Sequence, residues 1–270
     1  MNSDKDKLWD ELWDNDEASI DLIVSQVRRQ QLRHPIFQYI LKHYHNLASI
    51  EICEVGAGMA LTSLSLGIQG AKVTLLDISS IALEKSKKVA RALGIEADCI
   101  KMDILSPSQD MLGRFDVVLS FGLAEHFYGN ERFRVIENHV KLAKPGGLIT
   151  IHVPNAGCPF YRLWKLVAEK RGWWSVGFEQ PFSRNELKLI GRQLPIDELN
   201  ITSADFFYAL NRFFLHKLFW GISNIARNKS LSGKGRPFHI PAGLNIPELQ
   251  IPILQYFGYS LSLMCVKKNI

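Results

Sequence analysis

Short apolar runs alternate with amphipathic stretches through the middle of the chain. The runs at residues 50–55, 72–77, 115–121 and 148–153 are rich in Ile, Val and Leu and have the length of buried strands, and residues 97–102 have the same length. Stretches with a helical spacing of apolar residues follow the earlier runs. This alternation predicts an α/β fold, in which a mainly parallel sheet carries helices on both faces.

The two ends of the chain extend this pattern. Apolar residues recur at helical spacing in residues 8–13, 20–27 and 36–41, which predicts an N-terminal helical cap over residues 1–48. Residues 197–203 and 259–266 read as a sixth and a seventh strand. The sheet is therefore expected to have seven strands, with more than fifty residues between the last two.

The domain organisation follows from these elements. Residues 49–204 are expected to form the core, which includes an insert at 155–182 on the substrate side, and residues 258–270 supply the last strand. Between them, residues 205–257 form an aromatic, basic insert with a helical pattern. From Phe206 to Arg236 this insert has six Lys and Arg residues and no acid.

Three interpretations of the insert remain open: a lid over an apolar substrate, a face of a homodimer, or a peripheral membrane contact through residues 206–236. Nucleic acid is disfavoured, because the aromatic residues cluster at core spacing and do not interleave with the basic ones. The charge is uneven as well. Residues 1–155 have 17 basic against 20 acidic residues, whereas residues 156–270 have 15 against 7.

The first strand ends in a glycine pair that defines the candidate site. Gly56 and Gly58 permit a sharp turn and leave room for a ligand against the backbone. A dinucleotide loop would have a third glycine where Leu61 stands. Glu54, two residues before Gly56, would repel a pyrophosphate but suits a cation. A nicotinamide oxidoreductase is therefore disfavoured.

Acidic residues also follow the second and third strands. Asp77 comes 19 residues after Gly58, a spacing that sets a carboxylate beside a ribose in a β-α-β unit. Asp103 follows the third strand, where capping of a local turn is the competing explanation. Because the carboxyl ends of parallel strands share one edge of a sheet, these groups are expected to converge.

The Glu-x-Gly-x-Gly loop, Asp77, and the Lys144-Pro145-Gly146-Gly147 turn before the fifth strand together resemble class I S-adenosylmethionine (SAM) methyltransferases, in particular the small-molecule group that includes the ubiquinone-biosynthesis type. The resemblance covers residues 48–155. It implies a Rossmann-like fold, SAM as the cofactor and S-adenosylhomocysteine (SAH) as the product. The residues expected to bind the cofactor are Glu54, Gly56, Ala57, Gly58, Asp77, Ile78, Asp103, Ile104, Phe121 and Gly122.

Methyl transfer needs alignment of the reacting atoms and exclusion of water more than it needs a catalytic group. If a base is used, His126 is the first candidate and His152 the second, because histidine accepts a proton at neutral pH. A structural role for either is the alternative. No metal site is expected, because His43 and His45 have no carboxylate or cysteine partner at ligand spacing.

Substrate contacts are expected from the variable parts of the chain, with packing in the core or in a dimer as the competing explanation for each residue. The candidates are Trp13, Asn155, Tyr161, Arg162, Trp173 and Glu179. The predicted function is methyl transfer to O or N of a small, largely apolar metabolite. The alternatives are an RNA or protein methyltransferase and a SAM-binding scaffold without turnover. Four well-separated cysteines and an acidic N-terminus predict a cytoplasmic protein.

Overall fold

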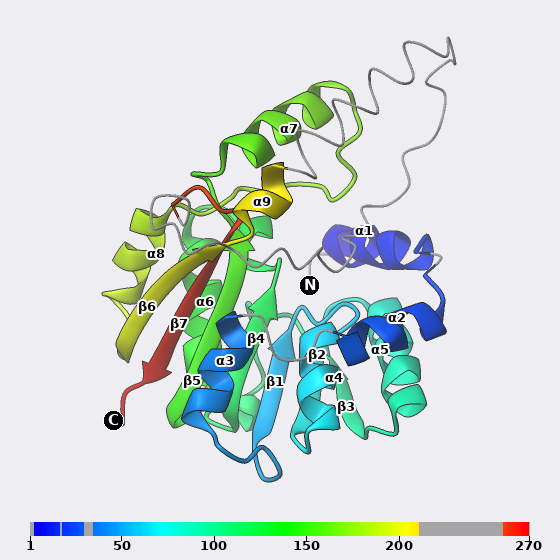
Figure 1. The fold of residues 1–270 in the computed structure, drawn as a ribbon, viewed down its shortest axis with the longest axis vertical. Helices are drawn as coiled ribbons and strands as arrows, with labels where there is room; N and C mark the ends of the chain where they lie inside the picture. Colours follow the sequence, from blue (N-terminus) through cyan, green and yellow to red (C-terminus); the bar gives the residue numbers. More distant parts are fainter. Residues whose placement is uncertain (1–2, 17, 30–34, 211–255, 270) are drawn as a thin grey trace.

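The computed structural model describes residues 3–16, 18–29, 35–210 and 256–269 (Figure 1). The described strands form one open, twisted sheet in the order β3-β2-β1-β4-β5-β7-β6. The first five strands are parallel, and β7 is antiparallel to both β5 and β6. Their bounds are β1 Glu51–Val55, β2 Lys72–Asp77, β3 Ala97–Lys101, β4 Phe115–Phe121, β5 Ala143–Pro154, β6 Ile196–Ala204 and β7 Ser260–Lys267. The predicted seven-stranded α/β fold is confirmed.

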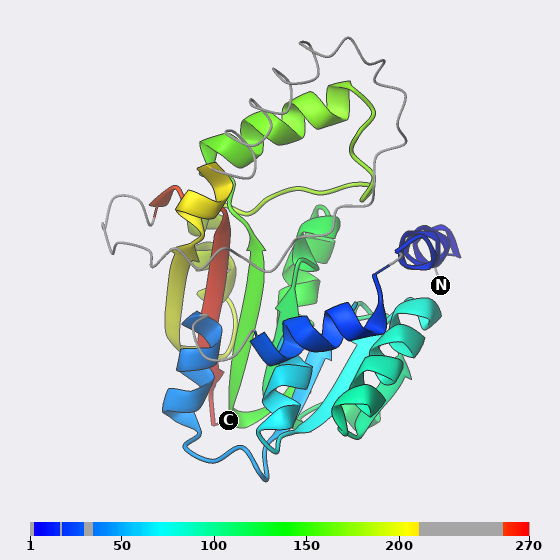
Figure 2. The ribbon, with the colours of Figure 1, turned by 45° about the vertical axis from the view of Figure 1, so that its right-hand side comes forward.

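Helices cover both faces of this sheet (Figures 1 and 2). They are α1 Ser3–Asp14, α2 Ile20–Arg29, α3 Pro35–His43, α4 Leu61–Ile68, α5 Ser80–Leu93, α6 Asn130–Leu142, α7 Pro159–Lys170, α8 Arg184–Gly191 and the short α9 Phe206–Ala209. Among the described residues, none of these helices is long and apolar enough to cross a membrane.

Alternate residues of each strand face opposite helix layers. Cys53 and Val118 pack with α6 and α8, whereas Ile52 and Val117, their neighbours in the chain, pack with α3 and α4. On the half of the sheet formed by β2 and β3, Leu75 contacts a cluster that includes α2, α4 and α5. Burial on both faces explains why the central strands are almost continuously apolar in sequence.

Capping residues define the ends of two helices. Ser79 caps α5 by accepting a hydrogen bond from the Ala82 amide, and Gly94 ends this helix with φ of 74°. Ser183 caps α8 by accepting from the Glu186 amide. Ser183 and Glu186 have the spacing of a capping box, but only half of it forms, because the Glu186 carboxylate pairs with the Arg132 guanidinium at 2.7 Å.

The Pro-Gly-Gly turn lies inside the fifth strand. Pairing of β4 with β5 runs from Phe115 opposite Ala143 directly to Val117 opposite Leu148, so residues 144–147 bulge out of the ladder. Beyond this bulge β5 pairs regularly and ends at the same sheet edge as β1, β2 and β4.

The C-terminal strands are found where the pattern placed them. Strands β6 and β7 pair with each other, and residues 205–259 connect them. Most of the predicted insert, residues 211–255, lies outside the described part of the chain, so its three interpretations stay predictions.

Candidate cofactor and substrate site

The loop between β1 and α4 turns through three residues with positive φ: Gly56 at 63°, Gly58 at 50° and Ala60 at 52°. A Cβ atom on Gly56 would lie 2.7 Å from the Leu123 side chain, and one on Gly58 would lie 2.7 Å from the Trp13 ring. Both positions therefore need glycine for space as well as for backbone conformation. Helix α1, seen end-on at the right of Figure 2, reaches this loop through Trp13.

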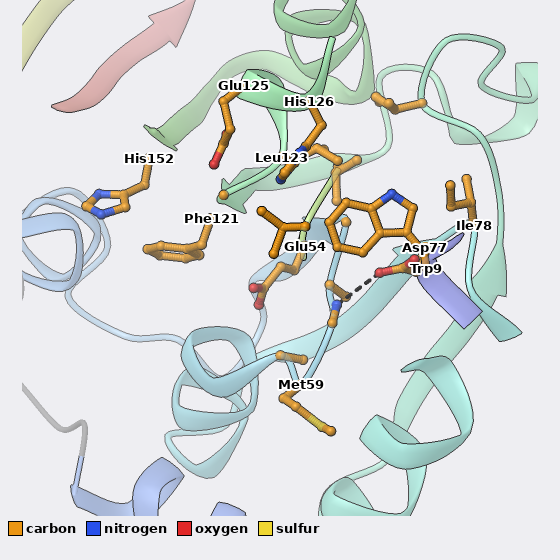
Figure 3. A pocket seen from close by; sticks show the side chains of 18 of the residues that line it. Trp9, Glu54, Met59, Asp77, Ile78, Phe121, Leu123, Glu125, His126 and His152 are labelled. Atoms are coloured by element: carbon orange, nitrogen blue, oxygen red, sulfur yellow. Dashed lines mark hydrogen bonds between the residues drawn. The ribbon is translucent and has the colours of Figure 1, made fainter. Parts of the chain in front are cut away.

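Asp77, at the carboxyl end of β2, is buried and holds the loop in place. Its Oδ2 accepts a hydrogen bond from the Gly58 amide at 3.0 Å, and its Oδ1 accepts one from the Ser79 amide at 2.8 Å (Figure 3). Burial raises the pKa of Asp77, and these backbone bonds oppose the rise. The structure thus places the carboxylate beside the glycine loop, and its contact with a ribose stays a prediction.

Glu54, near the end of β1, is also buried. Its Oε2 accepts hydrogen bonds from both the amide, at 3.2 Å, and the hydroxyl of Ser63. Burial raises the pKa of Glu54 to about 7, the Ser63 bonds lower it, and the nearby charge of Asp77 raises it further. A positive group next to Glu54 would favour its ionised form.

These residues line a cavity of about 1100 Å³ at the carboxyl ends of the strands. It lies where the strand order reverses between β1 and β4, the position at which open α/β sheets bind ligands. All ten residues predicted to bind the cofactor are part of its wall: Glu54, Gly56, Ala57, Gly58, Asp77, Ile78, Asp103, Ile104, Phe121 and Gly122. Asp103 also caps a local turn, in which its Oδ1 accepts from the Leu105 amide at 2.9 Å.

Both candidate bases line the cavity as well. His126 Nδ1 lies 2.8 Å from the carbonyl oxygen of Phe178, and only a protonated nitrogen can make that bond. In the neutral ring the lone pair is therefore on Nε2. His152 Nδ1 lies 2.9 Å from the Ser262 hydroxyl. The His126 ring packs edge-on against Trp9, with 4.9 Å between ring centroids.

The predicted substrate residues separate into two groups. Trp13 lines the cavity, but Asn155, Tyr161, Arg162, Trp173 and Glu179 are not part of its wall. The Asn155 amide donates to the Tyr256 and Gly258 carbonyl groups at 3.0 and 2.9 Å, which ties the start of α7 to the segment before β7. The Tyr161 hydroxyl donates to Glu179, and the exposed Arg162 donates to the Ala156 carbonyl group. Trp173 stacks on Trp164.

Several wall residues had not been identified from the sequence. Trp9, on α1, contributes an aromatic face. Glu125, Phe178 and Tyr259 also line the cavity. A usable signal existed only for Glu125, a charged residue that directly follows an apolar strand and precedes a candidate base. The other residues come from distant segments, and nothing local predicts where their side chains point.

The cavity is acidic. Among the residues that the structure describes, the acids in its wall are Asp6, Asp16, Glu54, Asp77, Asp103, Glu125, Glu131 and Asp205, and the bases are Lys101 and Arg134. Even when Glu54 and Glu125, whose pKa values are raised by burial, are left out, acids outnumber bases in the wall, opposite in sign to the net charge of +5 of the whole chain. An acidic wall attracts cations and repels polyanions.

Residues 53–149 match the family model of a methyltransferase domain. This part of the chain is therefore similar to methyltransferase domains. It is 31% identical over 134 residues to a ubiquinone biosynthesis O-methyltransferase of Rickettsia felis, a match over 50% of this chain and 53% of that protein. A protein of the same name from Erwinia tasmaniensis is 28% identical over 40% of this chain and 44% of its own length. The chain spans about half the length of the curated relatives it matches.

Solved structures extend the likeness of the methyltransferase domain to the whole fold. A magnesium protoporphyrin IX methyltransferase from Synechocystis PCC 6803 with bound SAH has a TM-score of 0.56 at 15% identity, over 99% of this chain and 96% of that one. A protein described as a putative sarcosine dimethylglycine methyltransferase from Galdieria sulphuraria has a TM-score of 0.57 at 11% identity, over 86% and 82% of the two chains. At these identities the likeness is one of fold.

Proposed function

We propose that this chain transfers a methyl group from SAM to an oxygen or nitrogen atom of a small, largely apolar molecule. The observation that carries the proposal is the convergence of all ten predicted cofactor residues on one cavity. They come from the ends of β1, β2, β3 and β4, which are far apart in sequence and adjacent in the sheet. The family match over residues 53–149 supports the same activity.

The residues of the cavity fit this cofactor. Gly56 and Gly58 leave the loop backbone without side chains, and the buried carboxyl groups of Glu54 and Asp77 suit a ligand with positive charge and hydroxyl groups. SAM, when bound, supplies a methyl group activated by a sulfonium leaving group. The chain orients the acceptor and excludes water, and His126 accepts a proton from the acceptor atom through Nε2.

Two observations favour this function over the alternatives. The acidic wall opposes a nucleic-acid substrate, whose phosphates it would repel. A cavity of about 1100 Å³ exceeds what one drug-sized ligand needs, which leaves room for an acceptor beside the cofactor and disfavours a scaffold without turnover. A homodimer, a membrane contact through residues 206–236 and a cytoplasmic location stay predictions.

The experiment is incubation of the protein with methyl-labelled SAM and native cell extract, followed by separation of lipid, small-molecule, RNA and protein fractions. Label is expected in the lipid or small-molecule fraction, and the Asp77→Ala variant serves as the control that should transfer little. Label in RNA or protein would refute the substrate class. Binding of SAM without label in any fraction would favour the scaffold.

A further inference from the structure

Glu125 is a buried acid in the wall of the cavity. It lies in the 3₁₀ turn Ala124–His126, which directly follows β4, and it is 2% exposed. Figure 3 shows its carboxyl group pointing into the cavity between His152 and Leu123. Its Oε2 has no hydrogen-bond partner among the residues that the structure describes. A buried polar atom in this state is unusual and needs an explanation.

The neighbouring cation does not supply the missing bond. Arg132 on α6 lowers the pKa of Glu125 through its charge, but its Nε and Nη1 are bonded elsewhere, and its buried Nη2 has no hydrogen-bond partner among the described residues. Its Nε donates to Glu186 at 2.7 Å, and its Nη1 donates to the carbonyl oxygens of Phe127 at 3.2 Å and Gln180 at 3.0 Å. Arg132 therefore fixes the segments around the turn and leaves Glu125 without an ion pair.

The other groups around Glu125 work against its ionisation. Burial has the largest effect, and the charge of Glu179, in the segment after α7, adds to it, so the pKa of Glu125 is well above its ordinary range. Glu179 itself accepts a hydrogen bond from Tyr161 on α7. Tyr259, before β7, also interacts electrostatically with both acids. These effects favour the protonated form of Glu125, a carboxylic acid, which can donate as well as accept a hydrogen bond.

We propose that Glu125 binds the acceptor by hydrogen-bonding a hydroxyl or carbonyl oxygen next to the atom that receives the methyl group. The proposal rests on the proposed methyltransferase function and narrows its substrate class. A neutral carboxyl group can donate to a carbonyl oxygen or accept from a hydroxyl group. It offers no charge to a protonated amine. Oxygen-bearing, uncharged acceptors are therefore preferred.

Two substitutions distinguish hydrogen bonding of the acceptor by Glu125 from binding through its negative charge and from no contact with the acceptor. Glu125→Gln keeps the shape and the ability to donate and accept hydrogen bonds, whereas Glu125→Ala removes both. The matched control is Glu137→Gln, a partly exposed glutamate on α6 that is not part of the cavity wall. Each variant is assayed with methyl-labelled SAM and an organic-solvent extract of cells as the source of acceptor. The half-saturating amount of extract and the maximal rate are measured, together with SAH affinity by calorimetry.

We expect Glu125→Ala to raise the half-saturating amount of extract by about 10- to 100-fold, the loss of one buried hydrogen bond or more. Glu125→Gln should restore it to within about threefold of the parent. SAH affinity should change in neither variant. In parent-minus-Glu125→Gln infrared spectra at pH 7, the parent should show the carbonyl stretch of a protonated carboxylic acid.

Three results would overturn the proposal. One is an equal rise in the half-saturating amount of extract in Glu125→Gln and Glu125→Ala, or a carboxylate band in the infrared difference spectrum. Either would mean that Glu125 binds the acceptor through its negative charge and that the acceptor is a cation. Unchanged saturation in Glu125→Ala would remove the residue from acceptor binding while the methyltransferase function stands. A parent that binds SAH but labels nothing in the extract would refute the proposed function itself, and the Glu125 role with it.

Discussion

Glu54 makes the stability of this protein depend on pH in a direction that can be measured. Burial raises the pKa of its carboxyl group from 4.5 in the unfolded chain to about 7 in the folded one. Between these values the folded state holds a proton that the unfolded state has lost, so stability falls as pH rises. At about 1.4 kcal/mol per pKa unit, the loss from pH 4 to pH 7 is about 3 kcal/mol.

The substitution Glu54→Gln removes this contribution, because an amide has no proton to lose. Its carbonyl oxygen still accepts from Ser63, so the loop remains supported. The variant should therefore gain about 3 kcal/mol relative to the parent as pH rises from 4 to 7. His139 titrates in the same range but with opposite sign, since burial lowers its pKa from 6.5 to about 4. Only the difference between the stability of the parent and that of Glu54→Gln, taken at each pH, isolates the contribution of Glu54.

The assay is urea denaturation followed by circular dichroism at several pH values between 4 and 7.5. Glu84→Gln, at an exposed position on α5, leaves the buried carboxyl group in place and should keep the pH slope of the parent. A parent-minus-variant difference for Glu54→Gln that stays constant within about 1 kcal/mol would refute the reasoning, because it would mean that Glu54 ionises alike in both states.

Further predictions concern the cofactor side. Asp77→Ala should weaken SAH binding at least about tenfold, because it frees the Gly58 and Ser79 amides and removes the proposed ribose partner. Asp98→Ala, at an exposed site, is the control and should bind SAH like the parent. Equal SAH affinities of the two variants by calorimetry would contradict this prediction. Gly58→Ala should weaken SAH binding by displacing the Trp13 ring. The control is Gly113→Ala, because Gly113 also has a positive φ but has open space where a Cβ atom would lie. An equal loss of SAH affinity in both variants would exclude a steric cause.

The fold and the cofactor side of the cavity were predictable because their signals are local. A strand, the glycine pair after it and an acid at the end of the next strand are each contained in a few residues. The parallel arrangement then brings the strand ends together without further information. Thus Glu54 and Asp77 could be placed in one site from their positions in the sequence alone, although their roles there remain to be tested.

The acceptor side was not predictable, because it depends on which way side chains turn in three dimensions. The aromatic run after residue 155 indicated a substrate wall, yet Tyr161 bonds to Glu179, and Trp164 and Trp173 stack on each other. Part of the wall comes from Trp9, on a helix more than a hundred residues away in sequence. Helical spacing predicts that such a residue lies on the buried face of its helix, but it does not predict which residues pack against it.

The uneven distribution of charge along the sequence can be compared with the residues that line the cavity. The basic excess lies in residues 156–270, but seven of the eight acids in the cavity wall come from residues 1–155. The functional signal was therefore in the less conspicuous acidic half. In the proposed reaction the sulfonium charge of SAM disappears when SAH forms. Because an acidic wall holds a cation more strongly than a neutral thioether, methyl transfer itself weakens the electrostatic hold and favours release of the product.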